Sequence, residues 1–352
     1  MPIIEVSSQV VDSDIQIYRL RKWTGGLRTQ IQESLNKGSQ GMFRWVSCQL
    51  QVIANCINAR DLTRALNSLP RSLTESYTSV LANIEECYRE YAFKILLWLA
   101  VSPKPLRIQD AADVLSIDFE ADNGPLFDPD LRVQDFGDII SICSTLVTPI
   151  KAYRGCNGIT VEFTELCLAH HTVKEYLLSD VFKAKFPQPV PFTDQKQVHG
   201  FVAKTSIAYL LSLHEPATPT LLNDRPLSRL AAEIWLHHYL KAGSSSQLTG
   251  LAMQLLASDG DTEPYKNWCR LYDLTRPWRQ PSFERERFPD PLYYTSSFGV
   301  ERLVSELLER GADLTKKGEV HQSCLQAAAY HGHYRVAEIL LQAGADPDDV
   351  SH

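Results

Sequence analysis

The chain has 352 residues and a formal net charge of −7, because 42 Asp and Glu outnumber 35 Lys and Arg. This length predicts two or three domains, and an apolar content of 44% is enough for packed cores, which excludes a wholly disordered chain. No apolar run approaches the roughly 18 residues that a membrane helix needs, and the N-terminus lacks the pattern of a secretory signal. The acidic balance argues against broad binding to a phosphate backbone.

The 8 cysteines form no C-x-x-C pair, and we interpret them as scattered core thiols. His237 and His238 are neighbours on a predicted helix and point in different directions, so we expect no shared metal ion. Reduced thiols favour an intracellular protein, and no Lys/Arg cluster resembles a nuclear import signal. We therefore expect the cytoplasm rather than the nucleus, with no membrane partner, no metal and no cofactor.

Apolar residues recur with helical spacing from 73 to 101, which predicts one helix with Thr74 as its N-cap. The next predicted elements are helices at 108–115 and 138–146, strands at 147–150 and 158–168 around a turn at 153–158, and a helix at 172–178. Three helices followed by a hairpin are the order of a winged helix.

Winged helices often bind DNA, but the charge of this region predicts that it does not. Residues 101–150 hold Lys104, Arg107 and Arg132 as their basic residues, against nine acidic ones. A face that reads DNA needs the opposite balance. We expect a packing module here and no nucleic-acid partner.

Residues 290–352 contain an internal repeat, with equivalent residues 33 positions apart, which is the period of the ankyrin repeat. The equivalent pairs are Leu292 and Leu325, Gly299 and Gly332, Leu307 and Leu340, and Gly311 and Gly344. Glycine permits the tight turn between two antiparallel helices and the left-handed conformation that ends the second helix. The sequence therefore predicts two ankyrin repeats, the first of them degenerate.

Two repeats are fewer than the three or so that an independent solenoid needs. A third repeat would begin at 346–349, close to the last residue of the sequence. We expect the chain to be the C-terminal part, or a shortened relative, of a longer protein.

Several motifs, in order along the chain, resemble the region that follows the nucleotide-binding core of fungal NACHT-ankyrin proteins. They are Gly41-Met42-Phe43-Arg44-Trp45-Val46, Leu69-Pro70, Leu97-Trp98-Leu99-Ala100, Leu168-Ala169-His170-His171-Thr172, Ala231-Ala232-Glu233 and Leu271-Tyr272-Asp273. The resemblance implies descent from signalling NTPases of the STAND type, which act in non-self recognition and programmed cell death. In such proteins the C-terminal repeats sense a partner.

The chain departs from that family in the nucleotide site itself. A phosphate-binding loop needs G-x-x-x-x-G-K-[ST], and the sequence contains no such string. The resemblance then places the start of this chain after the NTPase core, with residues 15–52 as its last helices. We expect no enzymatic activity and no nucleotide binding by this chain alone.

His170 matches the histidine of the family motif H-x-[ST]-x-x-E-[YF], which can reach the β-phosphate of bound ADP in related switch proteins. An imidazole can donate a hydrogen bond to a phosphate oxygen, so the role is chemically sound. The alternative is that His170 ends a strand and caps the next helix, and we favour this alternative because the chain lacks a phosphate-binding loop.

These features predict a mainly α fold with four parts. They are a helical remnant following a NACHT core (1–55), a helix plus a winged-helix domain with a small β-hairpin (56–185), a helical linker region (186–285) and two ankyrin repeats (286–352).

The function that we expect is non-enzymatic protein–protein interaction through the ankyrin face, in a regulatory protein derived from a STAND-type signalling protein. The candidate contacts are Arg287, Tyr293, Lys316, Lys317, Glu319 and Gln326. One alternative is a nuclear ankyrin-type transcription coregulator. Another is one part of a signalling NTPase whose phosphate-binding core lies on another chain or upstream, which would place His170 near a nucleotide.

Overall fold

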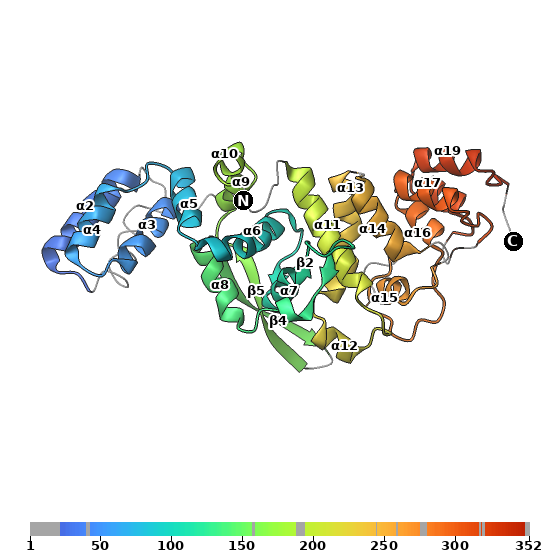
Figure 1. Cartoon of the computed structure of the whole chain (residues 1–352), viewed down its shortest axis with the longest axis horizontal. Coiled ribbons are helices and arrows are strands. Elements are labelled where there is room, and N and C mark those ends of the chain that lie inside the picture. The colour runs from blue at the N-terminus through green and yellow to red at the C-terminus, as the bar shows by residue number, and fades with distance from the viewer. Residues whose placement is uncertain are drawn as a thin grey trace. The chain divides into compact units, whose positions relative to one another are not determined.

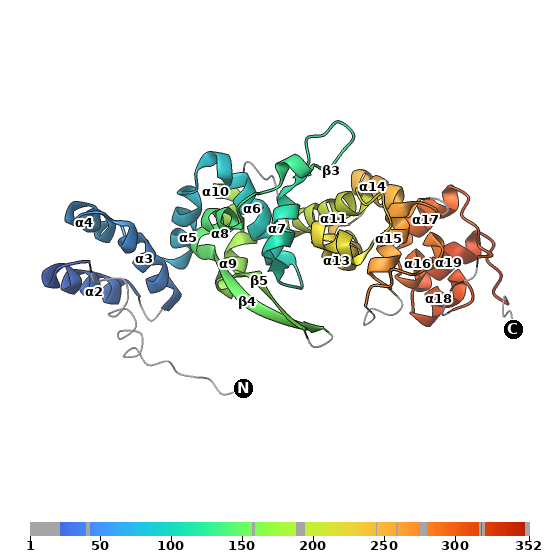
Figure 2. The same ribbon diagram turned by 90° about the horizontal axis from the view of Figure 1, so that it is seen from below.

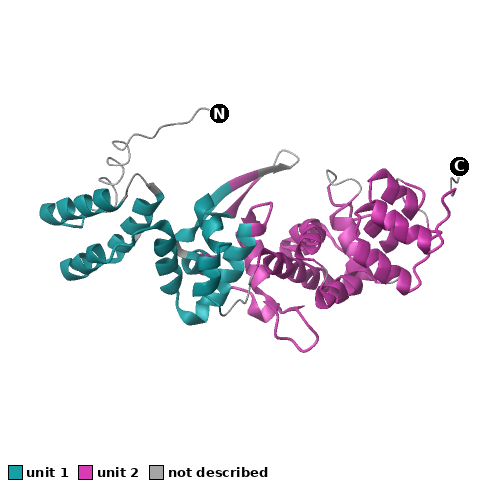
Figure 3. Cartoon of the chain, turned by 90° about the horizontal axis from the view of Figure 1, so that it is seen from above, with its two compact units in different colours: residues 1–100, 140–151, 166–191 teal, residues 101–139, 152–165, 192–352 magenta. Residues whose placement is uncertain are grey.

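The computed structural model describes residues 22–39, 43–156, 159–187, 194–243, 245–257, 260–274, 280–316, 318 and 321–348. The fold is mainly helical, as the sequence predicts, and it forms two compact units (Figure 3). Unit 1 takes the described residues of 1–100, 140–151 and 166–191, and unit 2 takes those of 101–139, 152–165 and 192–352. No helix in these described ranges is long and apolar enough to cross a membrane. The division into four parts stays a prediction.

Unit 1 is built from short helices. They are α2 (Gly25–Ser39), α3 (Phe43–Asn55), α4 (Ala59–Asn67), α5 (Leu73–Ala82), α6 (Glu86–Val101), whose last residue belongs to unit 2, α9 (His171–Leu177) and α10 (Asp180–Lys185). The first three helices share a core that includes Ile31, Trp45 and Leu62. Phe93 of α6 packs edge-on against Phe182, with ring centroids 5.3 Å apart, which fixes α10 on α6.

The single helix predicted over 73–101 is two helices, so that prediction is wrong in its length and its cap. The N-cap is Ser72, which lies in extended backbone and whose hydroxyl accepts from Glu75 N at 3.1 Å. The first helix ends at Ala82, and the second begins at Glu86. An apolar stripe of helical period runs through both helices, and the periodicity therefore hides the break.

Strands and short helices follow in the predicted order of helix, helix, helix and hairpin. They are β1 (Leu106–Arg107), α7 (Ile108–Leu115), β2 (Ile117–Asp118), β3 (Leu126–Phe127), the 3₁₀ turn Pro129–Leu131, α8 (Phe136–Cys143), the 3₁₀ turn Ser144–Leu146, β4 (Val147–Cys156) and β5 (Ile159–Leu168). The larger sheet has the strand order β1-β5-β4, and β2 pairs antiparallel with β3, with Ile117 opposite Phe127. The hairpin, with β4 and β5 side by side in Figure 2, is longer than predicted, because β4 continues through the expected turn to Cys156.

The described residues between 194 and 274 are mainly helical. They contain α11 (Gln195–Leu211), α12 (Pro219–Asp224), α13 (Ser228–Ala242), α14 (Ser246–Leu256) and α15 (Glu263–Leu271). Trp235 and Trp268 are buried with ring centroids 4.9 Å apart, so α13 and α15 share an aromatic core. The Asn267 side chain donates to Leu213 O at 3.0 Å and accepts from Ala217 N at 2.7 Å, which fixes the loop after α11.

Two buried polar contacts join α11 to its neighbours. The Asp113 carboxylate of α7 accepts from the Tyr209 hydroxyl and pairs with Arg132 at 2.7 Å. Between α11 and α13, His199 Nδ1 and His238 Nδ1 lie 2.8 Å apart, so one ring donates and the other accepts. Burial, followed by the neighbouring His199, lowers the pKa of His238 to about 3. The exposed His237 points elsewhere, as predicted for adjacent helix positions.

The C-terminal region consists of two pairs of packed helices (Figures 1 and 2). The first pair is α16 (Pro291–Ser297) and α17 (Glu301–Glu309), and the second is α18 (Cys324–Tyr330) and α19 (Tyr334–Gln342). Gly299 and Gly332 have φ values of 69° and 76° in the turns, and Gly311 and Gly344 have 82° and 94° after the second helices. The predicted roles of all four glycines are confirmed.

Candidate protein-binding surface

The two helix pairs begin at side-chain caps that the sequence supplies one repeat apart. Asp290 accepts from Leu292 N at 2.9 Å and starts α16. Ser323 accepts from Gln326 N at 3.2 Å and starts α18. Each cap satisfies a backbone N–H group that the helix itself cannot pair, so both inner helices begin at defined residues.

Hydrogen bonds join the second repeat to the first. His333 donates from Nε2 to the carbonyl of Ser297 at 3.1 Å, and its ring occupies the space next to Gly299. The Tyr293 hydroxyl accepts from His321 N at 3.0 Å, and its ring fills the space next to Gly318. Both glycines are therefore required by close approach of a ring from the other repeat.

The predicted partner contacts fall into different environments. Tyr293 is completely buried, so its prediction as a partner contact is wrong: its ring is part of the core between the repeats. Lys316 pairs with Asp290 at 2.9 Å, and the Gln326 side chain accepts from Gln322 N at 3.1 Å, so both have roles inside the chain. Arg287 is exposed and stays a prediction. Lys317 and Glu319 lie outside the described residues.

An exposed aromatic patch, which we define as His321, Tyr330 and His331, lies on the second repeat. Tyr330 is 74% exposed, and its ring centroid lies 4.4 Å from that of His321 and 5.1 Å from that of His331. Burial, together with the neighbouring His321 and His333, lowers the pKa of His331, which favours its neutral form. Rings with polar edges at the surface suit protein recognition, because they offer contact area and hydrogen bonds together.

Sequence reasoning missed this patch, because Tyr330 and His331 occupy positions that do not define the repeat. Ala327, Ala328 and Gly332 carry the ankyrin pattern, and the residues between them are free to vary. The available signal was Tyr330 itself, which directly follows a run of alanines on a predicted inner helix. The ankyrin pattern has no core position for a large ring there.

His170 is the N-cap of α9, which is the alternative that we favoured from the sequence. Its Nδ1 accepts from Thr172 N at 3.3 Å and lies 2.8 Å from Thr172 Oγ1. The hydroxyl of Tyr77 lies 2.7 Å from the same Oγ1. Because Nδ1 accepts a hydrogen bond, this ring nitrogen carries no proton, and Thr172 donates to it.

The charge state of His170 fits this capping role. Partial burial, followed by the neighbouring His171 and Arg44, lowers its pKa. Arg44 itself donates to the carbonyl of Thr145 at 2.7 Å. His170 is therefore neutral at physiological pH and holds the start of α9, and its nucleotide contact stays a prediction.

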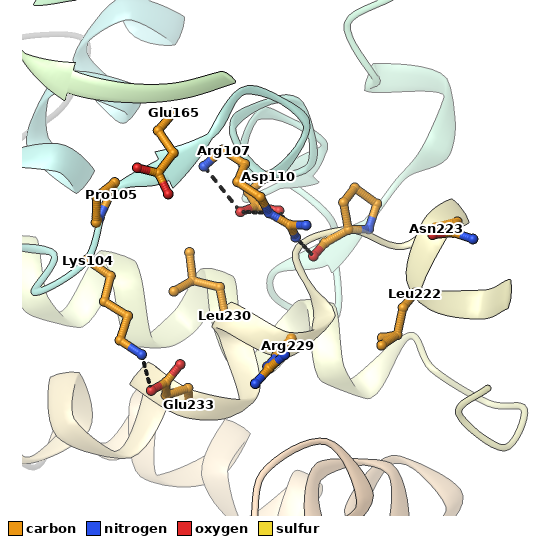
Figure 4. Close-up of a pocket in the computed structure, with 11 residues that line it drawn as sticks. Lys104, Pro105, Arg107, Asp110, Glu165, Leu222, Asn223, Arg229, Leu230 and Glu233 are labelled. Atoms are coloured by element: carbon orange, nitrogen blue, oxygen red, sulfur yellow. Dashed lines mark hydrogen bonds and ion pairs between the residues drawn. The ribbon is translucent and has the colours of Figure 1, made fainter. Parts of the chain in front are cut away.

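A cavity of about 270 Å³ lies in unit 2 beside α13 (Figure 4). Its charged lining residues balance: they are Lys104, Arg107, Arg229, Asp110, Glu165 and Glu233. Lys104 pairs with Glu233, while Arg107 pairs with Asp110 and donates to the carbonyl of Pro226 at 2.6 Å. These charges hold α7 and α13 to β1. No group of three potential metal ligands occurs within the described ranges.

Comparison with known proteins supports the repeat and adds one relative. Residues 321–352 match the ankyrin repeat family, which identifies the second predicted copy as an ankyrin repeat. This class of repeat indicates protein–protein interaction.

The chain is 29% identical over 305 residues to "Azaphilone pigments biosynthesis cluster protein L" of Monascus ruber. The alignment covers 82% of this chain and 63% of the relative, so the chain spans under two thirds of that protein. No solved structure matches. Neither match concerns NACHT or STAND proteins, and that resemblance rests on the sequence motifs.

Proposed function

We propose that this chain is a non-enzymatic regulatory protein that binds another protein through its ankyrin repeats, with the aromatic patch at the centre of the contact. The observation that carries the proposal is the pair Tyr330 and His321, whose ring centroids lie 4.4 Å apart, with Tyr330 74% exposed on an ankyrin repeat. Rings of this kind offer a partner both contact area and hydrogen-bonding groups in one place.

The relative from Monascus ruber suggests a biological process in which this chain acts. Its name assigns it to the biosynthesis cluster of azaphilone pigments. We propose that this chain likewise serves a fungal biosynthetic cluster and that its partner is a protein of that cluster.

Descent from a STAND-type signalling protein is part of the same proposal. The strand order β1-β5-β4, with α7 and α8 between β1 and β4 in the chain, supports the winged-helix interpretation and with it the family motifs around His170. The capping role of His170 supports a retained structural element that works without a nucleotide. Titration of the purified chain with ADP and with ATP should show no binding, and submicromolar affinity for either would favour the NTPase alternative.

Affinity capture with tagged variants in the native host tests the protein-binding function. Tyr330→Ser combined with His321→Ser should lose the specific partner proteins that the unaltered chain retains. Tyr88→Ser is the matched control, because Tyr88 is also an exposed aromatic residue, at 46%, but lies on α6. All variants should melt at the same temperature. Equal capture by the patch variant and the unaltered chain would refute the proposal.

A further inference from the structure

One carboxylate that lines the cavity of unit 2 has no cation of its own. The two other lining carboxylates are neutralised, because Lys104 pairs with Glu233 and Arg107 pairs with Asp110 at 2.6 Å. Glu165, on β5, forms no hydrogen bond or ion pair with the residues that the structure describes. Its negative charge is therefore available to a ligand.

The basic side chains of the cavity are already engaged. Arg107 donates to the Asp110 carboxylate from its backbone N at 3.2 Å, from Nε at 2.9 Å and from Nη2 at 2.6 Å. Its Nη2 also donates to the carbonyl of Pro226 at 2.6 Å. Lys104 has Glu233 as its partner, and Arg229 likewise has an interaction within the chain. These contacts argue against an anionic ligand.

Apolar side chains form the walls beside the free carboxylate. Pro105, Leu222, Pro226 and Leu230 all line the cavity. Figure 4 shows the Glu165 side chain extending from β5 towards Leu230 of α13. The cavity volume of about 270 Å³ lies below the roughly 300–1,000 Å³ of sites for drug-sized ligands, so the bound group should be small. A short aliphatic chain with a cationic head matches both the walls and the carboxylate.

The cation should be organic rather than a metal ion. Calcium and magnesium are held by six or more oxygen ligands, several of them from the protein. No group of three potential metal ligands occurs in the part of the chain that the structure describes. An ammonium or guanidinium group differs, because one carboxylate suffices for a charge-assisted hydrogen bond.

We propose that this cavity binds an ammonium or guanidinium group on a short aliphatic chain, with Glu165 as its counter-ion. The aliphatic chain lies against Leu222 of α12 and Leu230 of α13. The site goes beyond the proposed protein binding, because it shares no residue with the aromatic patch on the second ankyrin repeat. A free amine and a lysine or arginine side chain of another protein have this chemistry in common.

Isothermal titration calorimetry of the full chain tests the site with n-butylamine and agmatine, and with butyrate as an anion of similar length. Both cations should bind with a Kd below about 1 mM, and butyrate should bind at least about 10-fold more weakly. Glu165→Gln keeps the shape of the side chain and should weaken both cations by about 10-fold or more, because the ion pair is lost. Its Tm should not change, since Glu165 has no partner among the described residues.

Glu162→Gln is the matched control. Glu162 is exposed on the same strand, and its position three residues before Glu165 places it on the opposite face. This variant loses the same charge and should change the affinity for either cation by less than about 2-fold.

Lysine blocked at both termini represents the side chain of a protein. If it binds more tightly than n-butylamine and depends on Glu165, the site is supported and its natural ligand is a protein. Tighter binding of the free amines supports a small molecule. Equal affinities of Glu165→Gln and the unaltered chain, preferential binding of butyrate, or no binding of any probe up to about 10 mM would overturn the inference. Partner capture through Tyr330 is measured separately, so the proposed function stands or falls on its own test.

Discussion

His333 of the second ankyrin repeat donates from Nε2 to the carbonyl of Ser297 in the first repeat, at 3.1 Å. The imidazole reaches this carbonyl because Gly299, two residues later, has no side chain in its way. A Cβ atom at position 299 would lie 2.5 Å from His333 Nδ1. This hydrogen bond depends on the absence of a methyl group at position 299, and a second polar contact between the repeats joins His321 N to the Tyr293 hydroxyl.

Gly299→Ala should destabilise the ankyrin region by about 2–3 kcal/mol, because the new methyl group displaces His333 and the backbone φ of 69° is strained for alanine. Gly311→Ala is the control, since its φ of 82° is equally strained but no atom lies within 4 Å of the new Cβ. The control should cost only about 1 kcal/mol. Urea unfolding measures both values, and equal losses would contradict a steric role for His333.

Asp113→Ala should cost unit 2 about 3–5 kcal/mol, because it leaves the Arg132 guanidinium and the buried Tyr209 hydroxyl without their shared carboxylate. Asp130→Ala, in the exposed 3₁₀ turn before α8, should stay within about 0.5 kcal/mol of the unaltered chain. Thermal and urea unfolding would measure the difference. A loss below 1 kcal/mol at Asp113 would show that the carboxylate is not needed to hold α7 and α11 together.

Acid should weaken the packing of α11 and α13 through His238. Its folded-state pKa of about 3 lies below the ordinary value of 6.5. Between these two pH values His238 is therefore protonated in the unfolded chain and neutral in the folded chain. Stability is therefore complete above pH 6.5 and falls as the pH drops from 6.5 towards 3, by about 2 kcal/mol at pH 5.

Replacing both His199 and His238 with leucine should reduce the loss of stability between pH 7.5 and pH 5. Without these imidazoles, neither the folded nor the unfolded chain binds a proton at these two positions. His237→Gln removes an exposed histidine next to His238 and should keep most of the acid sensitivity. Melting temperatures at the two pH values provide the measurement. An unchanged acid response in the double leucine variant would assign the effect to other groups.

His170→Ala should cost about 1 kcal/mol, because Thr172 N and the Thr172 hydroxyl lose their acceptor at the start of α9. His171→Ala changes the adjacent exposed residue and should be nearly neutral. Chemical unfolding compares the two, and a cost of the same size for both would argue against the capping role.

Local chemistry made the ankyrin region and the short helices predictable. Gly299 and Gly311 occupy backbone conformations that few other residues adopt, so their positions in the sequence define the turns. His170 followed by Thr172 is likewise a local capping pattern. The cap of α5 was placed at Thr74 instead of Ser72, because both residues suit the role and only the backbone geometry distinguishes them.

Contacts between distant residues were not predictable from a single sequence. His199 and His238 are 39 residues apart, and nothing local to either residue indicates the other. Tyr293 was predicted at the surface because the first repeat departs from the ankyrin pattern there. The ring is buried because Gly318, more than 20 residues later in the chain, leaves room for it. The exposure of Tyr330 depends in the same way on which neighbours the fold supplies.

The chain enters and leaves both compact units several times, because residues 101–139 and 152–165 of unit 2 lie between segments of unit 1. A protease that cuts any single peptide bond therefore divides at least one unit between two fragments. Genetic exchange meets the same constraint: neither unit is one uninterrupted stretch of coding sequence, so a single crossover cannot transfer one whole unit without segments of the other. Such a layout favours inheritance of the two units together, while the ankyrin pair, which is continuous in sequence, can be lengthened, shortened or replaced on its own.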